Sequence, residues 1–187
     1  MSQTPVQFLE TSPGLPQESR LMCEKEILMV VSDAPQGWML RDQWNALVRG
    51  EGCPACAEIR SGATSEGYVV ARLQLSHLRL MRNQFVPGYS VLVCTRHGPE
   101  AYHLSTDEQA HFFQDLVRAT RALDRVFAPI KMNVNLLGNL VPHLHAHLVP
   151  RYYGDPTPGR PIDPGLQVVT LTPDEYQERV QWIQAAL

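Results

Sequence analysis

The sequence has few of the features that mark membrane, secreted or polyanion-binding proteins. Its longest apolar run is the five-residue segment 27–31, which is too short to cross a membrane. Residues 1–10 lack a cationic start followed by an apolar core, so no secretory signal is predicted. Lys and Arg (16) do not outnumber Asp and Glu (19), which disfavours non-specific nucleic-acid binding. Four cysteines are too few for a disulfide scaffold. We therefore expect a cytoplasmic protein without membrane or nucleic-acid partners.

The composition predicts one domain with additions at its ends. A hydrophobic content of 44% and a charged content of 19% are enough to build a core, and 187 residues are few for two full domains. Residues 1–50 are interrupted by prolines and show no clear period, so they are interpreted as an extension packed on the domain. The domain itself is expected to span residues 51–155. Residues 156–187 are expected to form a proline-rich arm and a final helix.

Two hydrophobic periods follow one another along the chain. Residues alternate with the period of a strand from 69 to 81, with a change of phase that predicts a turn or bulge near Ser76. Further strands are expected over 89–95, 132–136 and 144–149. Because the first three strands are joined by short links, they are expected to pair antiparallel.

Helix signals lie between and after these strands. Ser105 and Glu108 have the spacing of a capping box, and a helical period of about five turns follows them. Thr172 and Glu175 repeat the capping pattern before the last short helix, and residues 43–48 have the pattern of one or two helical turns. Strands and helices do not alternate one for one, so the fold class is α+β.

Three histidines at alternate positions form the most informative motif. His143, His145 and His147 are spaced so that a strand would project all three imidazoles from one face. Leu144, Ala146 and Leu148 would bury the opposite face. A neutral imidazole is a good nucleophile near pH 7 when its second nitrogen donates a hydrogen bond that fixes the tautomer. Neighbouring imidazoles can supply donors to a phosphate or bind a metal. With no phosphate-binding Gly-rich motif ending in Lys-Ser/Thr, the chemistry is not that of a P-loop enzyme.

Cys53-Pro-Ala-Cys56 is the second motif. A C-x-x-C pair by itself fits either a zinc site or dithiol redox chemistry. No thioredoxin-like βαβ pattern surrounds it, and a closed structural zinc site needs two more ligands from elsewhere in the chain. Zinc is therefore favoured, while a redox protein using the two cysteines remains a weaker alternative. Cys23 and Cys94 are interpreted as buried thiols.

Two segments carry a resemblance to a known family. Residues 133–139 (NVNLLGN) followed by VPHLHAHLVPRY resemble the signature of the histidine triad (HIT) superfamily. Residues 83–93 (NQFVPGYSVLV), ending at Arg96-His97, resemble the strand–turn–strand that opens the nucleotide pocket in that family. The resemblance implies a HIT-like fold, with a five-stranded antiparallel sheet, a long helix and a homodimer. The C-terminal helix lies outside the matched segments.

The resemblance also implies an activity. The protein would be a nucleotide hydrolase or nucleotidyltransferase acting on a dinucleoside polyphosphate or a nucleotide phosphoramidate. The middle histidine, His145, would attack the α-phosphate and form a nucleotidyl-histidine intermediate. Many members carry a serine near the position of Leu140, so the donor that assists the leaving group in those members is absent or replaced here. The residues that the resemblance assigns to substrate binding are Asn83, Asn133, Asn139 and His147.

Zinc-carrying members of the family imply the complete ligand set. The matching positions in this sequence are Cys53, Cys56, His97 and His143. His103 competes with His97, which is preferred because it directly follows the predicted strand and Arg96. The main alternative function is a non-catalytic, zinc-stabilised nucleotide sensor. Arg151 and the tyrosines after it either border the pocket and contact phosphates or form a solvated rim.

Overall fold

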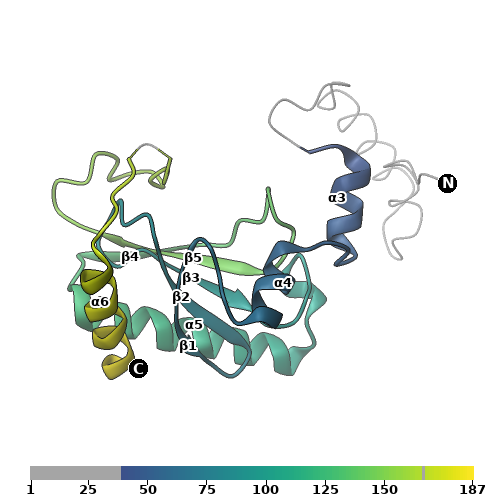
Figure 1. Ribbon diagram of the computed structural model, residues 1–187, viewed down its shortest axis with the longest axis horizontal. Coiled ribbons are helices and arrows are strands. Elements are labelled where there is room, and N and C mark those ends of the chain that lie inside the picture. The colour runs from purple at the N-terminus through teal and green to yellow at the C-terminus, as the bar shows by residue number, and fades with distance from the viewer. Residues whose placement is uncertain (1–38, 166) are drawn as a thin grey trace. The chain divides into compact units, whose positions relative to one another are not determined.

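Five strands form one antiparallel sheet within residues 39–165 and 167–187, the part of the chain that the computed structural model describes (Figure 1). Their order across the sheet is β1-β2-β3-β5-β4. The strands are β1 Gly67–Arg72, β2 Ser76–Met81, β3 Ser90–Cys94, β4 Lys131–Asn135 and β5 His145–Arg151. The predicted hairpin is present, with its turn at residues 73–75 and a bulge in β1 between Val69 and Ala71.

The helices confirm most of the predicted pattern. They are α3 Arg41–Val48, α4 Pro54–Ser61, α5 Thr106–Phe127 and α6 Pro173–Ala186, with a short 3₁₀ turn, η1, at Ala101–His103. Capping boxes start α5 at Ser105 and α6 at Thr172, as the sequence predicted. The predicted extension lies largely outside the described residues, of which 39–50 contribute α3.

Helix α4 was not predicted, although it has two clear sequence signals. Pro54 occupies its first turn, where the absent N–H costs nothing. Gly62 follows its last turn in the left-handed conformation, with φ 72°, and its N–H donates to the carbonyl of Glu58. The sequence analysis considered this region only as a C-x-x-C pair, so the pattern of a short helix with proline first and glycine last was not used.

The two faces of the sheet bury different clusters. One face packs against α5 and α6, and its core includes Ala146 and Leu148 of β5 together with Leu144, which directly precedes that strand. The other face buries a smaller cluster, Tyr89, Val91, Val93 and Val149, against which Ala55 and Ile59 of α4 pack. Because side chains alternate along β5, His145 and His147 lie on this second face, beside α4.

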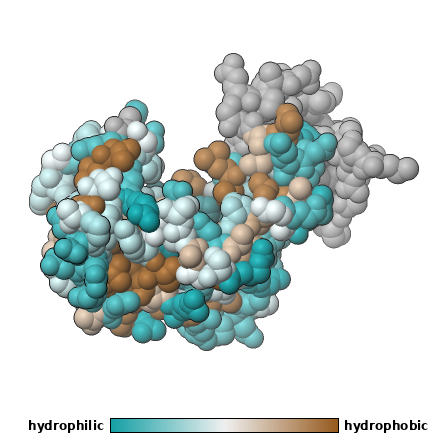
Figure 2. Space-filling model, viewed as in Figure 1, coloured by the Kyte–Doolittle hydropathy of each residue, from teal (hydrophilic) through white to brown (hydrophobic). Residues whose placement is uncertain are grey.

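The C-terminal arm between β5 and α6 contains no helix or strand in its described residues, as its prolines predicted. Residues Arg41–Leu187 form one compact unit. On the face drawn in Figure 2 the hydrophobic surface is divided into separate patches by hydrophilic side chains. No described helix is long and apolar enough to span a membrane.

Candidate active site and metal centre

The three motif histidines are held at the start of β5 and just before it. His143 precedes the strand and is fully buried, whereas His145 and His147 are partly buried within it. His145 pairs with Val93 of β3, and His147 pairs with Val91 of β3 and Asn135 of β4. Pairing with β3 therefore fixes the backbone at His145, and pairing with both β3 and β4 fixes it at His147.

His145 has a defined tautomer. Its Nδ1 lies 2.6 Å from the carbonyl oxygen of His143. A carbonyl can only accept, so Nδ1 carries the proton and Nε2 carries the lone pair. Burial, followed by the charge of Arg79, lowers the pKa of His145 below its ordinary value, although the bond to the carbonyl opposes this shift. The ring is therefore neutral near pH 7, and the lone pair of Nε2 is available to a ligand.

His147 contacts a tyrosine that directly precedes β3. Its Nδ1 lies 2.6 Å from the hydroxyl oxygen of Tyr89. Burial, and then the neighbouring His145, lower the pKa of His147 to about 4. Burial raises the pKa of Tyr89 to about 12, so the phenol stays protonated and the imidazole stays neutral near pH 7.

Four side chains converge into a candidate metal centre. One ligand atom from each of Cys53, Cys56, His97 and His143 lies within 4.8 Å of all the others. His143 Nδ1 is 3.5 Å from Cys53 Sγ, 3.6 Å from Cys56 Sγ and 3.3 Å from His97 Nδ1. A tetrahedral site with metal–ligand bonds of about 2.0–2.3 Å separates its ligands by about 3.3–3.8 Å. The three distances from His143 Nδ1 lie in this range.

Backbone carbonyls orient both imidazoles of this cluster. His143 Nε2 donates to the carbonyl of Cys94 at 2.7 Å, and His97 Nε2 donates to that of Val48 at 3.0 Å. Each ring therefore turns an unprotonated Nδ1 toward the two sulfurs, as a metal ligand requires. Burial, followed by the neighbouring Cys53, raises the pKa of the Cys56 thiol to about 11. Metal binding would therefore have to release thiol protons.

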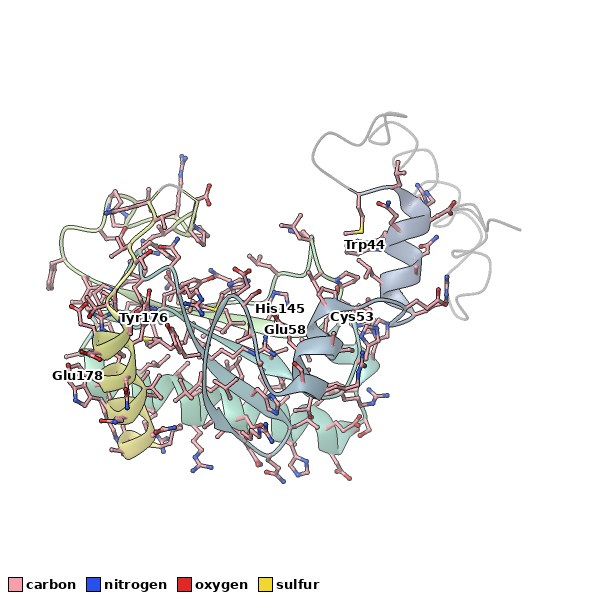
Figure 3. All side chains as sticks on the ribbon, in the orientation of Figure 1. Trp44, Cys53, Glu58, His145, Tyr176 and Glu178 are labelled. Atoms are coloured by element: carbon pink, nitrogen blue, oxygen red, sulfur yellow. The ribbon has the colours of Figure 1, made fainter. Side chains whose placement is uncertain are left out.

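The competing histidine is placed elsewhere. His103 Nδ1 accepts from the backbone N–H of Glu100 at 3.2 Å in the capping box of η1, and its ring packs on Tyr102. His97, not His103, contributes to the described cluster. The first ligand, Cys53, lies at the start of α4, and Figure 3 labels it together with Glu58 and His145.

The predicted substrate asparagines are not gathered at one point. Asn133 lies on β4, where its side-chain oxygen accepts from Arg151, and Asn139 is exposed in the loop between β4 and β5. The Asn83 amide donates to the carbonyls of Pro164 and Gln167 at 2.8 and 3.1 Å. Its oxygen also accepts from the N–H of Val169 at 2.9 Å. Asn83 therefore fastens the C-terminal arm, and a contact with substrate would require it to exchange these bonds.

Arg151 was expected either to border the pocket or to lie on a solvated rim, and the structure shows a different arrangement. It is 6% exposed, forms an ion pair with Asp155 and donates to the carbonyls of Thr157 and Arg160. Instead of bordering a pocket, the guanidinium folds the first turn of the arm onto β5. Four hydrogen-bond partners from one arginine explain how a proline-rich segment is held without regular structure.

A buried ion pair that was not predicted from the sequence lies beside the triad. Arg79 of β2 is 5% exposed and pairs through Nη1 with Glu58 of α4. Glu58 accepts a second bond from the Thr64 hydroxyl at 3.0 Å. The alternation of β2 places Arg79 on the face of the sheet that carries His145. An arginine flanked by leucines within a predicted strand was the available signal.

Comparison with known proteins identifies the domain. Residues 63–154 match the model of the HIT domain family. A Mycobacterium tuberculosis protein named AP-4-A phosphorylase is 35% identical over 104 residues, which cover 52% of this chain and 53% of that protein. A Schizosaccharomyces pombe protein named bis(5′-nucleosyl)-tetraphosphatase (asymmetrical) is 25% identical over 92 residues, covering 46% and 50% of the two chains. The chain thus spans about half the length of the curated relatives it matches.

Solved structures agree with this assignment. A histidine triad protein from Sinorhizobium meliloti has a TM-score of 0.61 and 26% identity, covering 65% of this chain and 90% of its own. A Zn-bound histidine triad family protein from Mycobacterium smegmatis has the same fold, with a TM-score of 0.53 at 19% identity, covering 72% of this chain and 91% of its own. The predicted five-stranded antiparallel sheet with a long helix and a C-terminal helix is confirmed. The chain therefore contains a HIT domain, the domain of the histidine triad family.

Proposed function

We propose that this protein is a nucleotide hydrolase or nucleotidyltransferase that acts at the α-phosphate of a dinucleoside polyphosphate. The observation that carries the proposal is the 2.6 Å contact between His145 Nδ1 and the carbonyl of His143, which leaves the lone pair on Nε2. The names of the M. tuberculosis and S. pombe relatives support a dinucleoside polyphosphate over a nucleotide phosphoramidate.

The chemistry divides into two displacements. His145 Nε2 attacks the α-phosphorus, forming an N–P bond while the bond to the bridging oxygen breaks and the departing nucleotide keeps the electron pair. Nδ1–H continues to donate to the carbonyl of His143, which stabilises the positive charge that develops on the ring. An acceptor oxygen then attacks phosphorus, and His145 leaves with the electrons of the N–P bond. His147 binds the phosphate in both steps.

The acceptor decides between two activities. Water would release a nucleoside monophosphate, as in a hydrolase, and inorganic phosphate would release a nucleoside diphosphate, as in a phosphorylase. One of the two curated relatives is named as a phosphorylase and the other as a tetraphosphatase. The same intermediate on His145 serves both outcomes.

We further propose that the metal centre holds structural Zn²⁺. Two thiolates and two imidazoles form a closed set of four ligands, as structural zinc sites require. Bound zinc would crosslink the start of α4 to His97 and His143, and it supplies no group to the reaction. The backbone carbonyl of His143 accepts a hydrogen bond from His145, and the imidazole of His143 lies in the cluster. Bound metal would therefore hold His143 in the position from which it orients His145.

The remaining expectations concern assembly and location. A homodimer is supported by the edge position of β4 and by Phe113 and Val117 of α5, which are 43% and 53% exposed. A cytoplasmic location is supported by the described cysteines, none of which forms a disulfide. Light scattering on the purified full chain tests the dimer, and the mass of a single chain would contradict it.

The proposed activity is tested by incubating the full chain with diadenosine polyphosphates, adenosine phosphoramidate and adenosine monophosphate, with and without inorganic phosphate. Turnover of the polyphosphates should be lost in His145→Ala and retained in the control His111→Ala, which changes a histidine on α5. Nucleotide binding without turnover of any substrate would contradict the proposal. The alternative of a non-catalytic nucleotide sensor, which the absence of a serine at Leu140 favours, would then stand.

A further inference from the structure

Tyr89 lies directly beside the proposed catalytic machinery but has no role in it so far. It is 4% exposed, packs edge-on against Phe85 and belongs to the small cluster on the His145 face of the sheet. Its hydroxyl is 2.6 Å from Nδ1 of His147. The two rings are nearly parallel, at 6°, with centroids 6.0 Å apart. This arrangement fits a hydroxyl approaching in the plane of the imidazole, where the lone pair of a ring nitrogen lies.

The acceptors available to the phenolic proton determine which group donates in the contact between Tyr89 and His147. Among the described residues, His147 Nδ1 is the one hydrogen-bond partner of the Tyr89 hydroxyl. If Nδ1–H donated to the phenol oxygen, the phenolic proton would be buried without an acceptor, which is unfavourable. The hydroxyl therefore donates and Nδ1 accepts. A neutral imidazole with Nδ1 as acceptor carries its proton on Nε2, at the opposite edge of the ring.

We propose that Tyr89 is a positioning residue that fixes His147 as the Nε2–H tautomer, so that His147 donates a hydrogen bond to the bridging oxygen of the departing nucleotide. This inference rests on the proposed function. The two histidines of β5 then have opposite tautomers, each set by a fixed partner. A carbonyl leaves His145 Nε2 unprotonated for attack, and a phenol leaves His147 Nε2 protonated for donation.

The loop before β3 is built to hold Tyr89 in place. Gly88 has φ +84°, and a Cβ there would meet the Phe127 ring at 2.6 Å, so the turn requires glycine. Gln84 is 3% exposed and crosses this turn. Its amide nitrogen donates to the carbonyls of Met81 and Tyr89 at 2.7 and 2.9 Å, and its oxygen accepts from the N–H of Gly88 at 2.9 Å.

The need for such a donor follows from Leu140. Leu140 is 71% exposed and carries no polar group, so it cannot supply the hydrogen bond that a serine near this position would give. Of the three triad histidines, His143 belongs to the metal cluster and His145 is the proposed nucleophile. His147 remains, and its Nε2 is available to donate a hydrogen bond to the departing nucleotide. The contact with Tyr89 keeps Nε2 protonated.

The test begins with the unaltered, full-length protein. Long-range ¹H–¹⁵N correlation of histidine-labelled protein reports which nitrogen of each neutral ring carries the proton, and His147→Gln and His145→Gln assign the signals. His147 should show a protonated Nε2 and a bare Nδ1 near pH 7.5, and His145 should show the reverse pattern. A protonated Nδ1 on His147 would overturn the proposal without any variant of Tyr89.

Kinetics then measure the consequence for turnover. Tyr89→Phe should lower kcat about tenfold with KM changed less than about threefold, because the phosphate is bound but the donor is no longer held in one tautomer. Tyr89→His, which can donate through its own ring, should recover part of kcat. Tyr176→Phe is the matched control, since it removes an equally buried hydroxyl that bonds to the carbonyl of Arg82 and not to the triad.

The outcomes separate this inference from the proposed function. An unchanged kcat in Tyr89→Phe, with His147 still protonated on Nε2, would show that Tyr89 positions nothing. If the unaltered protein turns over no substrate while His147 carries the predicted tautomer, the proposed function fails and the donation from Tyr89 stands. A loss in Tyr176→Phe equal to that in Tyr89→Phe would overturn the positioning role, because lost packing would explain both.

Discussion

Replacing Glu58 should leave the buried positive charge of Arg79 unpaired beside the candidate active site. Arg79 has a side chain 7% exposed, and Glu58 is its one ion-pair partner in the described structure. Breaking a buried pair from one side costs about 3–5 kcal/mol because the remaining charge stays desolvated. The Glu58 side chain is 25% exposed, so water can reach the vacated position, and we expect about 2–3 kcal/mol for Glu58→Ala. This energy includes the loss of the hydrogen bond that the Thr64 hydroxyl donates to Glu58.

Three companion variants make this prediction specific. Glu58→Gln keeps an acceptor for Arg79 and Thr64, so it should cost about 1–2 kcal/mol. The double variant Glu58→Leu with Arg79→Met removes both polar groups and should lie within about 1 kcal/mol of the unaltered protein. Glu51→Ala breaks the pair between Glu51 and Arg49, whose side chains are 61% and 59% exposed; because solvent screens this pair, the loss of stability should be far smaller than in Glu58→Ala.

Urea unfolding followed by far-UV circular dichroism, with the metal bound, measures these free energies at an unchanged m-value. The reasoning is refuted if Glu58→Ala costs no more than Glu51→Ala. It is also refuted if the double variant is less stable than Glu58→Ala, because the cost would then come from lost packing of α4 and not from an unpaired charge.

Three other predictions concern the metal, the pH dependence and the fold. Removing the metal with a chelator should lower Tm, and an unchanged Tm after complete removal would contradict a structural role. Metal analysis should find one zinc per chain in the unaltered protein and none in Cys56→Ser. Because the pKa values of His145 and His147 are lowered, both rings stay neutral until the pH falls below the ordinary value of 6.5, so the acid limb of kcat/KM should have its midpoint below pH 6.5. A midpoint at or above 6.5 would contradict these shifts. Ser105→Ala removes the acceptor for the Glu108 N–H and should cost about 1 kcal/mol in urea unfolding, and no loss would refute the capping role.

The sequence predicted those features that depend on local periodicity. Alternation along β5 placed Leu144, Ala146 and Leu148 in one core and the triad on the other face, and the capping boxes located the starts of α5 and α6. The spacing of His145 could be interpreted because a strand projects alternate side chains to one side. Such signals lie within a few residues of one another, so one sequence is enough to recognise them.

Contacts between distant segments were not predictable in the same way. Asn83 fastens residues more than eighty positions away, and Arg151 turns inward onto its own arm, although both were considered for the pocket. Tyr89 lies 58 positions from His147 and meets it only because β3 pairs with β5. Short polar contacts of this kind depend on the tertiary register, which no local pattern encodes.

The central claim is that His145 becomes covalently attached to a nucleotide. The most direct test mixes the full chain with a diadenosine polyphosphate, quenches it in mild base, where a phosphoramidate bond survives, and determines the intact mass. The unaltered protein should gain the mass of one adenylyl group, located on His145 by peptide mapping, and His145→Ala should gain none. Rapid turnover with no adduct at any quench time, or an adduct that persists in His145→Ala, would contradict the account.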